Sequence, residues 1–156
     1  MPVPTPEHIA LMGPAVLPFE RRGFDKDVQD GEDIPFFEDL YDATDDGKPD
    51  DVVAVDPANI EPDPKTGRYL WVITATGMHI ILEATPNPAA ERKVVCHTNI
   101  TGGGRALQGG ELWFGTDGVV YINYSSGRYG AFTDEHRQTV LDYFYYVEYE
   151  KVVVIE

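Results

Sequence analysis

The stretch HTNITGGGRALQGGELWFGTDGVVYINYSSGRY, residues 97–129, decides the fold of this chain. Two runs rich in β-forming residues, Leu107–Phe114 and Val119–Tyr124, flank the turn sequence of Gly115–Gly118. Apolar runs on both sides of a short turn that contains Asp and Gly are typical of a β-hairpin. We therefore expect this hairpin to form the centre of an antiparallel sheet.

The sequence on either side adds a second hairpin and a helix. Arg68–Ala75 and Met78–Ala84 are strand-like runs joined tightly at Thr76-Gly77. Thr133 is a suitable N-cap, and apolar residues recur at helical spacing through Thr133–Tyr146. Three further strands are predicted at Asp51–Val55, Lys93–Ile100 and Lys151–Ile155. The expected class is α+β, a mostly antiparallel sheet of six to seven strands with one clear C-terminal helix packed on it.

The length of 156 residues indicates a single domain, 1–156. Residues 1–18 contain five prolines and are predicted to be an extended lead-in. Residues 25–51 are predicted to form an acidic loop region, and residues 68–156 a β-meander followed by the helix.

The acidic residues are concentrated in the first part of the chain. Residues 1–64 hold 17 of the 27 acids and 4 of the 12 bases, which gives this part a net charge of −13 out of −15. Direct binding to nucleic acid is not expected, because phosphate contacts need Lys and Arg. A protein with a basic surface would suit this charge, although the charge also serves solubility.

Other features of the sequence concern the compartment. The longest apolar runs are too short to span a membrane, and Cys96 is the only cysteine, so an internal disulfide is impossible. No signal peptide is recognisable. We expect a cytoplasmic protein, or one secreted as an effector without a classical signal peptide.

Three segments, in order, resemble the core of the plant IQ-motif calmodulin-binding proteins and their fungal and bacterial relatives. They are Pro35-Phe36-Phe37 through Asp45-Asp46-Gly47-Lys48, then Tyr69-Leu70-Trp71-Val72-Ile73, then residues 97–129. In the last segment the family pattern is roughly HSSFLAGG, a β-run after AAG, and SGHY, where this chain has HTNITGGG, GGELWF and SSGRYGAF. The resemblance covers about residues 19–148. Similar domains end bacterial polymorphic toxins, so the resemblance implies an effector activity.

Two departures from that family matter. The chain has no IQ motif, because Val28-Gln29 is followed by acids, and its one clear helix is not basic, so calmodulin binding is not expected. Arg128 stands where the family has the histidine of SGHY, and Thr98 and Asn99 replace a pair of hydroxyls.

Polar residues at the ends of the central hairpin form a candidate site. If the protein is an enzyme, His97 is the candidate general base and Glu111 its partner or the residue that polarises a nucleophile. With His97 in the middle of a strand, Cys96 should point to the opposite face. Six residues are candidates for ligand binding: Thr98, Asn99, Ser125, Ser126, Arg128 and Tyr129. The arginine, the hydroxyls and the glycine turn favour an anion such as phosphate or carboxylate.

A metal site is only weakly indicated, and no cofactor is expected. Asp42, Thr44, Asp46 and Asp50 have the spacing of the first half of an EF-hand loop, but Val53 occupies the position of the bidentate glutamate.

Three functions follow from these features. The first is a small binding domain whose polar pocket holds an anionic ligand or a partner's loop. The second is a toxin or effector-type transferase that acts on a phosphate-bearing substrate such as a dinucleotide. The third is an acidic inhibitor or immunity-type protein.

Overall fold

The computed structural model describes residues 3–18, 31–36, 41–42, 52–57, 67–85, 94–131, 133–147, 149 and 151–155. Its strands are β1 (Tyr41–Asp42), β2 (Ala54–Val55), β3 (Tyr69–Thr74), β4 (Gly77–Leu82), β5 (Gln108–Gly115), β6 (Val120–Ile122) and β7 (Val152–Val154). Its helices are α1 (Pro6–Met12), α2 (His97–Thr101) and α3 (Asp134–Tyr146). The strands form one sheet in the order β1-β4-β3-β5-β6-β7, and β2 pairs with β5.

The sheet is mostly antiparallel, and this confirms the predicted α+β class. Only the β2–β5 and β6–β7 pairs are parallel among the strand pairs that the structure describes. Both predicted hairpins are present, as β3–β4 and β5–β6. The β3–β4 turn comes one residue earlier than predicted, because Thr74 pairs with Gly77.

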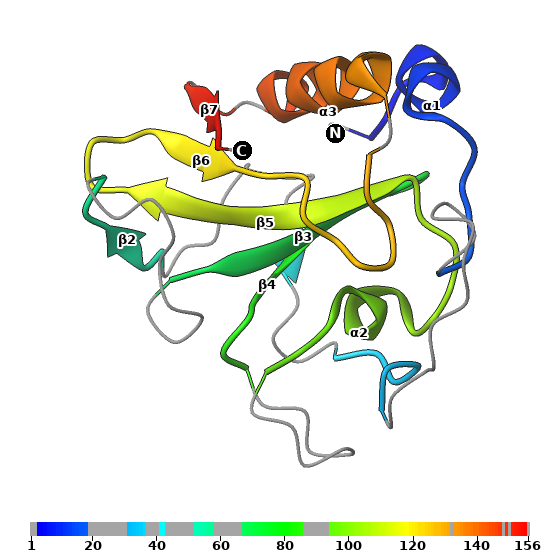
Figure 1. Ribbon diagram of the computed structural model, residues 1–156, viewed down its shortest axis with the longest axis horizontal. Coiled ribbons are helices and arrows are strands. Elements are labelled where there is room, and N and C mark those ends of the chain that lie inside the picture. Colours follow the sequence, from blue (N-terminus) through cyan, green and yellow to red (C-terminus); the bar gives the residue numbers. More distant parts are fainter. Residues whose placement is uncertain are drawn as a thin grey trace.

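The sheet has a different layer on each face (Figure 1). The helices α1 and α3 lie over one face, where Trp71, Ile73 and Phe144 belong to the larger apolar core. The short helix α2 lies on the opposite face, over a smaller apolar cluster that includes Leu70 and Val72. Alternate residues of β3 therefore supply the two cores, as the two-residue period of a strand requires.

The helix α3 begins as predicted. The Thr133 hydroxyl accepts a hydrogen bond of 3.0 Å from the His136 backbone N–H, and Asp134 and Glu135 occupy the first turn. Aromatic and apolar residues on one side of α3 pack on the sheet, among them Val140, Tyr143 and Phe144. This arrangement confirms the prediction of a C-terminal helix packed on the sheet.

The strand β7, at one end of the strand order, is held partly by a side chain of α3. The Lys151 carbonyl accepts a hydrogen bond from Val120 of β6, so the backbone groups of the next residue, Val152, face away from β6. The Tyr145 hydroxyl bonds both of those groups: it accepts from the Val152 N–H and donates to the Val152 carbonyl, each at 3.2 Å.

The first 18 residues contain a helix, so the prediction of an extended lead-in was wrong. Pro6 occupies the first helical turn of α1, where a missing N–H costs nothing. Thr5 and His8 cap α1 reciprocally, each side chain accepting a hydrogen bond of 3.1 Å from the other's backbone N–H. A proline at this position favours a helix start rather than preventing it.

The prediction of a strand over Lys93–Ile100 was also wrong, because His97–Thr101 form α2. Asn99 Oδ1 accepts a hydrogen bond of 2.9 Å from the Cys96 N–H at the start of this helix. Gly102 ends it in the left-handed conformation, with φ 64°. These two caps outweigh the strand preference of the β-branched residues in the segment.

Within the predicted acidic loop region 25–51, the structure describes only residues 31–36 and the short strand β1. Of the four residues with EF-hand-like spacing, Asp42 lies in β1, and Thr44, Asp46 and Asp50 lie outside the described residues.

Candidate functional site

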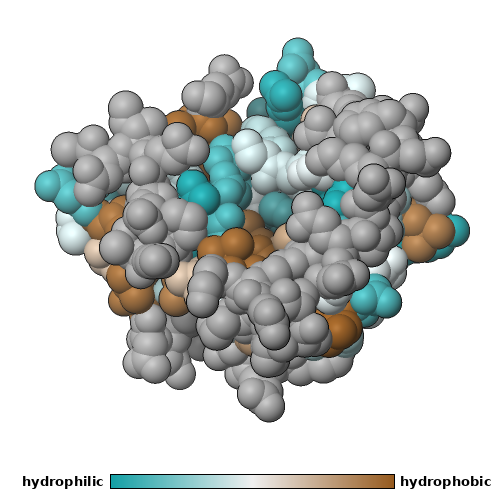
Figure 2. Space-filling view, turned by 60° about the horizontal axis from the view of Figure 1, so that its bottom comes forward, coloured by the Kyte–Doolittle hydropathy of each residue, from teal (hydrophilic) through white to brown (hydrophobic). Residues whose placement is uncertain are grey.

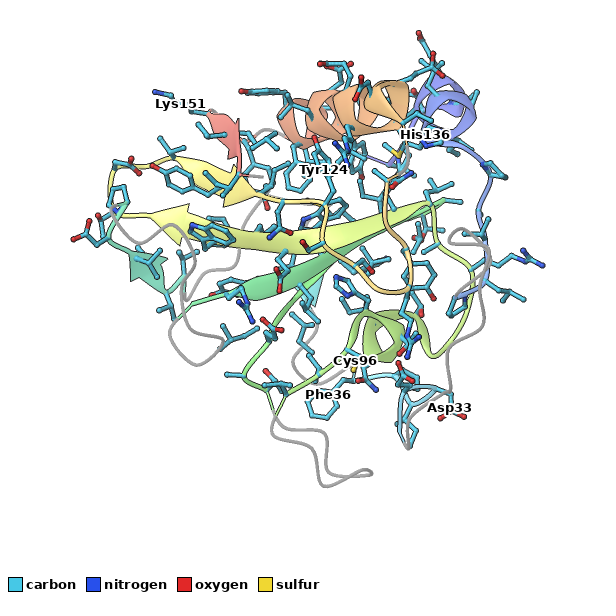
Figure 3. The ribbon with its side chains drawn as sticks, in the orientation of Figure 1. Asp33, Phe36, Cys96, Tyr124, His136 and Lys151 are labelled. Carbon is cyan, nitrogen blue, oxygen red and sulfur yellow. The ribbon has the colours of Figure 1, made fainter. Side chains whose placement is uncertain are left out.

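A pocket of about 450 Å³ opens on the face of the sheet that carries α2. Hydrophilic residues gather in a central hollow of this side of the molecule (Figure 2). The pocket is lined by the start of α2, the loop after β6, and residues of β3 and β5. Its polar lining consists of Glu32, Glu83, His97, Glu111, Ser125, Ser126 and Arg128. Figure 3 shows Cys96, which also lines the pocket, at the start of α2, on the opposite side of the sheet from His136.

Five of the predicted site residues meet in this pocket: His97, Glu111, Ser125, Ser126 and Arg128. They come from three separate segments of the sequence, and the sheet and α2 bring them together. Because Cys96 precedes a helix rather than lying in a strand, it lines the same pocket as His97 and does not point to the opposite face.

Two glycines of β5 explain how His97 reaches the sheet. A Cβ atom on Gly109 would lie 3.3 Å from His97 Cδ2 and 3.3 Å from Tyr129 Cβ, tighter than ordinary contact. On the other face, Trp71 of β3 is paired with Gly110 and its ring covers the space that a side chain there would fill. The Gly-Gly pair before Glu111 therefore lets a helix residue and an indole approach the same strand from opposite sides.

The His97 imidazole is held in one tautomer. Its Nε2 lies 2.7 Å from the Gly110 carbonyl oxygen, and since a carbonyl can only accept, Nε2 carries the proton. Burial lowers the pKa of His97, the Gly110 hydrogen bond opposes this shift, and the positive charge of Arg128 adds to it, so that the pKa is about 4. At neutral pH the ring is uncharged, and Nδ1 forms no hydrogen bond with the residues that the structure describes. Its lone pair is available in the pocket that the ring lines.

This geometry predicts that His97 stays neutral down to about pH 5. Imidazole ¹⁵N spectra should show a protonated Nε2 and an unprotonated Nδ1, with His97→Gln used to assign the signals among the four histidines. An ordinary pKa near 6.5 would contradict the burial argument.

The same shift predicts how stability depends on pH. The pKa of His97 is lower in the folded protein than in the unfolded chain, so the unfolded chain binds more protons between about pH 6.5 and 4. The contribution of His97 to the free energy of unfolding is therefore complete above this window and is lost as the pH falls through it. Between pH 7 and 5 the wild type should lose about 2 kcal/mol more than His97→Gln in urea unfolding.

Arg68 joins two carboxylates at the edge of the pocket. Its Nε forms a short hydrogen bond with Glu83 Oε2 and lies 3.2 Å from Glu111 Oε2. Asn123 Nδ2 donates a 3.0 Å hydrogen bond to the other oxygen of Glu111. Burial raises the pKa of Glu83, and the nearby charge of Glu111 raises it further, whereas Arg68 opposes the shift. This cluster fixes two carboxylates in the lining of the pocket that His97 also lines.

The guanidinium of Arg128 is bound by a carboxylate of the protein itself. Glu32 Oε1 accepts hydrogen bonds of 2.8 Å from Arg128 Nε and 2.6 Å from Arg128 Nη2. Both side chains are buried, with Glu32 only 2% exposed. The sequence predicted that Arg128 holds an anion, and in the structure the anion that it holds is Glu32.

Three residues predicted to bind a ligand lie outside the pocket lining and serve the fold instead. The Asn99 side chain donates hydrogen bonds of 2.6 and 2.8 Å to the Gly31 and Ile34 carbonyls. Thr98 is buried in α2. The Tyr129 hydroxyl donates to the Gly104 carbonyl, and burial raises the pKa of Tyr129 to about 12. Their role in ligand binding stays a prediction.

Sequence reasoning missed Glu32, Glu83 and Arg68. Arg68 and Glu83 stand opposite each other at the open end of the β3–β4 hairpin, where the Glu83 N–H donates to the Arg68 carbonyl at 2.9 Å. An Arg and a Glu flanking a predicted hairpin are a signal that could have found this pair. For Glu32 no such local signal exists, because it contacts a residue 96 positions later.

Metal-ligand geometry is not seen in the described ranges, where no three His, Cys, Asp or Glu side chains are placed to hold an ion. None of the helices described has the length and apolar character to cross a bilayer. Comparison with models of protein families, with curated proteins and with solved structures finds no match.

Proposed function

We propose that this protein binds a small polar molecule in the pocket between α2 and the sheet. The observation that carries the proposal is the convergence of His97, Glu111 and the Ser125–Arg128 loop on one pocket of about 450 Å³. This volume lies within the range of small-molecule sites. Groups with shifted pKa values, His97 and Glu83, lie together there, which is typical of functional sites.

The ligand in this proposal differs from the anion that the sequence favoured. The expectation of an anion depended on Arg128 together with the hydroxyls and the glycine turn, and Glu32 binds the guanidinium of Arg128. Ser125 still offers a hydroxyl group to a ligand, and Leu70, Val94 and Val95 offer apolar surface.

A second candidate is the predicted effector-type enzyme, and the state of His97 favours it. A neutral imidazole with an available Nδ1, in a pocket that carboxylates also line, can take a proton from a substrate hydroxyl. In that case Glu111 would position the substrate or the imidazole. The resemblance to the IQ-motif family and the role of the acidic region as an inhibitor surface stay predictions.

A screen of polar metabolites tests the binding proposal. Amino acids, amines, sugars and nucleotides are added to ¹⁵N-labelled protein, and binders should shift the amide signals of His97, Ser125 and Gly127. The same compounds should raise the melting temperature by a few degrees at concentrations well above Kd.

Two variants localise any binding that the screen finds. Glu111→Gln should weaken it, whereas Glu135→Gln, the same change at an exposed site on α3, should leave it unchanged. If no compound shifts the pocket signals, the binding proposal fails.

A further inference from the structure

We infer that the group this pocket takes is a cation, the ammonium or guanidinium group of a small ligand. The inference rests on the proposed function and names the chemical class of its ligand. It follows from the charges of the lining, from the hydrogen-bonding atoms left open there, and from the buried imidazole.

The charged groups of the pocket leave a negative excess among the residues that the structure describes. Three of its described lining residues are glutamates, Glu32, Glu83 and Glu111, against a single arginine, Arg128. Arg68 adds a second positive charge at the edge, so these groups sum to −1 when all are ionised. The whole chain carries −15, so its field attracts cations and repels anions.

Two of the atoms left open in the pocket are acceptors. Glu83 accepts from Arg68 through Oε2, and its Oε1 forms no hydrogen bond within the described residues. His97 Nδ1 is likewise without a hydrogen bond there. A carboxylate oxygen and an imidazole lone pair both need a donor, which an ammonium or guanidinium group supplies and a phosphate does not.

The position of His97 separates this site from an ordinary acidic surface cluster. His97 is 8% exposed and lines the pocket, and the hydrogen bond from its Nε2 to the Gly110 carbonyl fixes its ring. The Nδ1 atom of this imidazole has no hydrogen-bond partner among the described residues, and a ligand that donates a hydrogen bond would supply one. Arg68 illustrates that these carboxylates accept a guanidinium group, because its own guanidinium already bridges Glu83 and Glu111.

The test is a titration with agmatine, which carries a guanidinium and a primary amine. Amide ¹⁵N spectra of the protein at 20 mM NaCl monitor the titration. Inorganic phosphate and ribose are the anionic and neutral probes. Agmatine should shift the signals of His97, Ser125 and Gly127 saturably, and the other two probes should not. Raising NaCl to 300 mM should weaken agmatine binding by about threefold or more. The peptide acetyl-Gly-Arg-Gly-amide distinguishes a free amine from an arginine side chain as the source of the group.

Variants separate the cation site from general attraction to an acidic protein. Glu83→Gln should weaken agmatine binding about tenfold, because a charge-assisted hydrogen bond becomes a neutral one. Glu135→Gln removes the same charge from the opposite side of the sheet and should change Kd less than twofold. If Glu83→Gln does not fold, Glu111→Gln serves in the same comparison.

The outcomes distinguish the inference of a cationic ligand from the proposal that the pocket binds a small molecule at all. Phosphate or ribose binding at the pocket, without agmatine binding, would overturn the cation inference and leave a small-molecule pocket in place. Agmatine binding that neither Glu83→Gln nor Glu111→Gln weakens would also overturn it. If neither these probes nor the metabolite screen move the pocket signals, both proposals fail.

Discussion

Replacing Arg128 with methionine is expected to lower the free energy of unfolding by about 4 kcal/mol. The change leaves Glu32, which is 2% exposed, as a buried carboxylate without the guanidinium that donates two hydrogen bonds to it. A buried carboxylate that loses its guanidinium costs more than the lost attraction alone, because less of its desolvation is compensated. Urea unfolding monitored by tryptophan fluorescence measures the loss.

A double-mutant cycle identifies the ion pair as the cause. The loss of unfolding free energy in the double variant Glu32→Gln, Arg128→Met should be smaller, by about 2 kcal/mol, than the summed losses of the two single variants. Asp33→Asn, a change at the exposed neighbour of Glu32, is the control and should alter stability by less than about 0.5 kcal/mol. If Arg128→Met costs under about 1 kcal/mol, the pair does not hold residues 31–36 against the sheet.

This expectation changes how ligand experiments on Arg128 are interpreted. A variant that loses both the arginine and much of its stability cannot show that the arginine binds a ligand. Glu83 and Glu111 are better positions for such a test, because each side chain retains hydrogen-bonding capacity as glutamine.

Gly110→Ala is expected to lower the free energy of unfolding by about 3 kcal/mol. A Cβ atom there would overlap the Asn123 carbonyl oxygen and lie 2.6 Å from Trp71 Cζ2. The Trp71 indole is fully buried, and its Nε1 donates a 3.0 Å hydrogen bond to the Glu111 carbonyl, so it cannot move aside without losing that bond. The displacement should be visible as a changed tryptophan emission spectrum as well as a lower urea midpoint.

Gly118→Ala provides the matched comparison. A Cβ atom at Gly118 meets nothing within 4 Å, but its φ of 82° is unfavourable for alanine. Its cost should therefore be the backbone penalty alone, about 1 kcal/mol. Equal losses for the two variants would show that close packing at Gly110 is not what requires glycine there.

The parts of this fold that depend on local pattern could be predicted from the sequence. The β5–β6 hairpin and α3 were found because a turn sequence, a threonine N-cap and helical spacing are all signals within a few residues. The helix α2 was missed because the β-branched residues of its segment favoured a strand over the local Asn99 cap, and because no short window contains the contacts of Asn99 with residues 31–36.

The site was predictable to the extent that it belongs to the central hairpin. Glu111 was found because it lies in β5, and His97 and Ser125 were found because they precede β5 and follow β6. Glu83 was missed partly through register: a turn at Thr76-Gly77 would place Arg68 opposite Thr85, whereas the observed pairing continues to Glu83. An error of one residue in the turn thus hid one of the carboxylates of the pocket.

The Tyr145 hydroxyl at β7 limits how this protein can associate with itself. A sheet edge that displays N–H and C=O groups can pair with a strand of another molecule, and such pairing leads to aggregation. At Val152 both groups are already bonded to the Tyr145 hydroxyl, so an approaching strand finds them occupied. Phenylalanine would fill the same space without a donor or an acceptor. A single oxygen on α3 therefore keeps this stretch of the β7 edge from serving as a template for other chains.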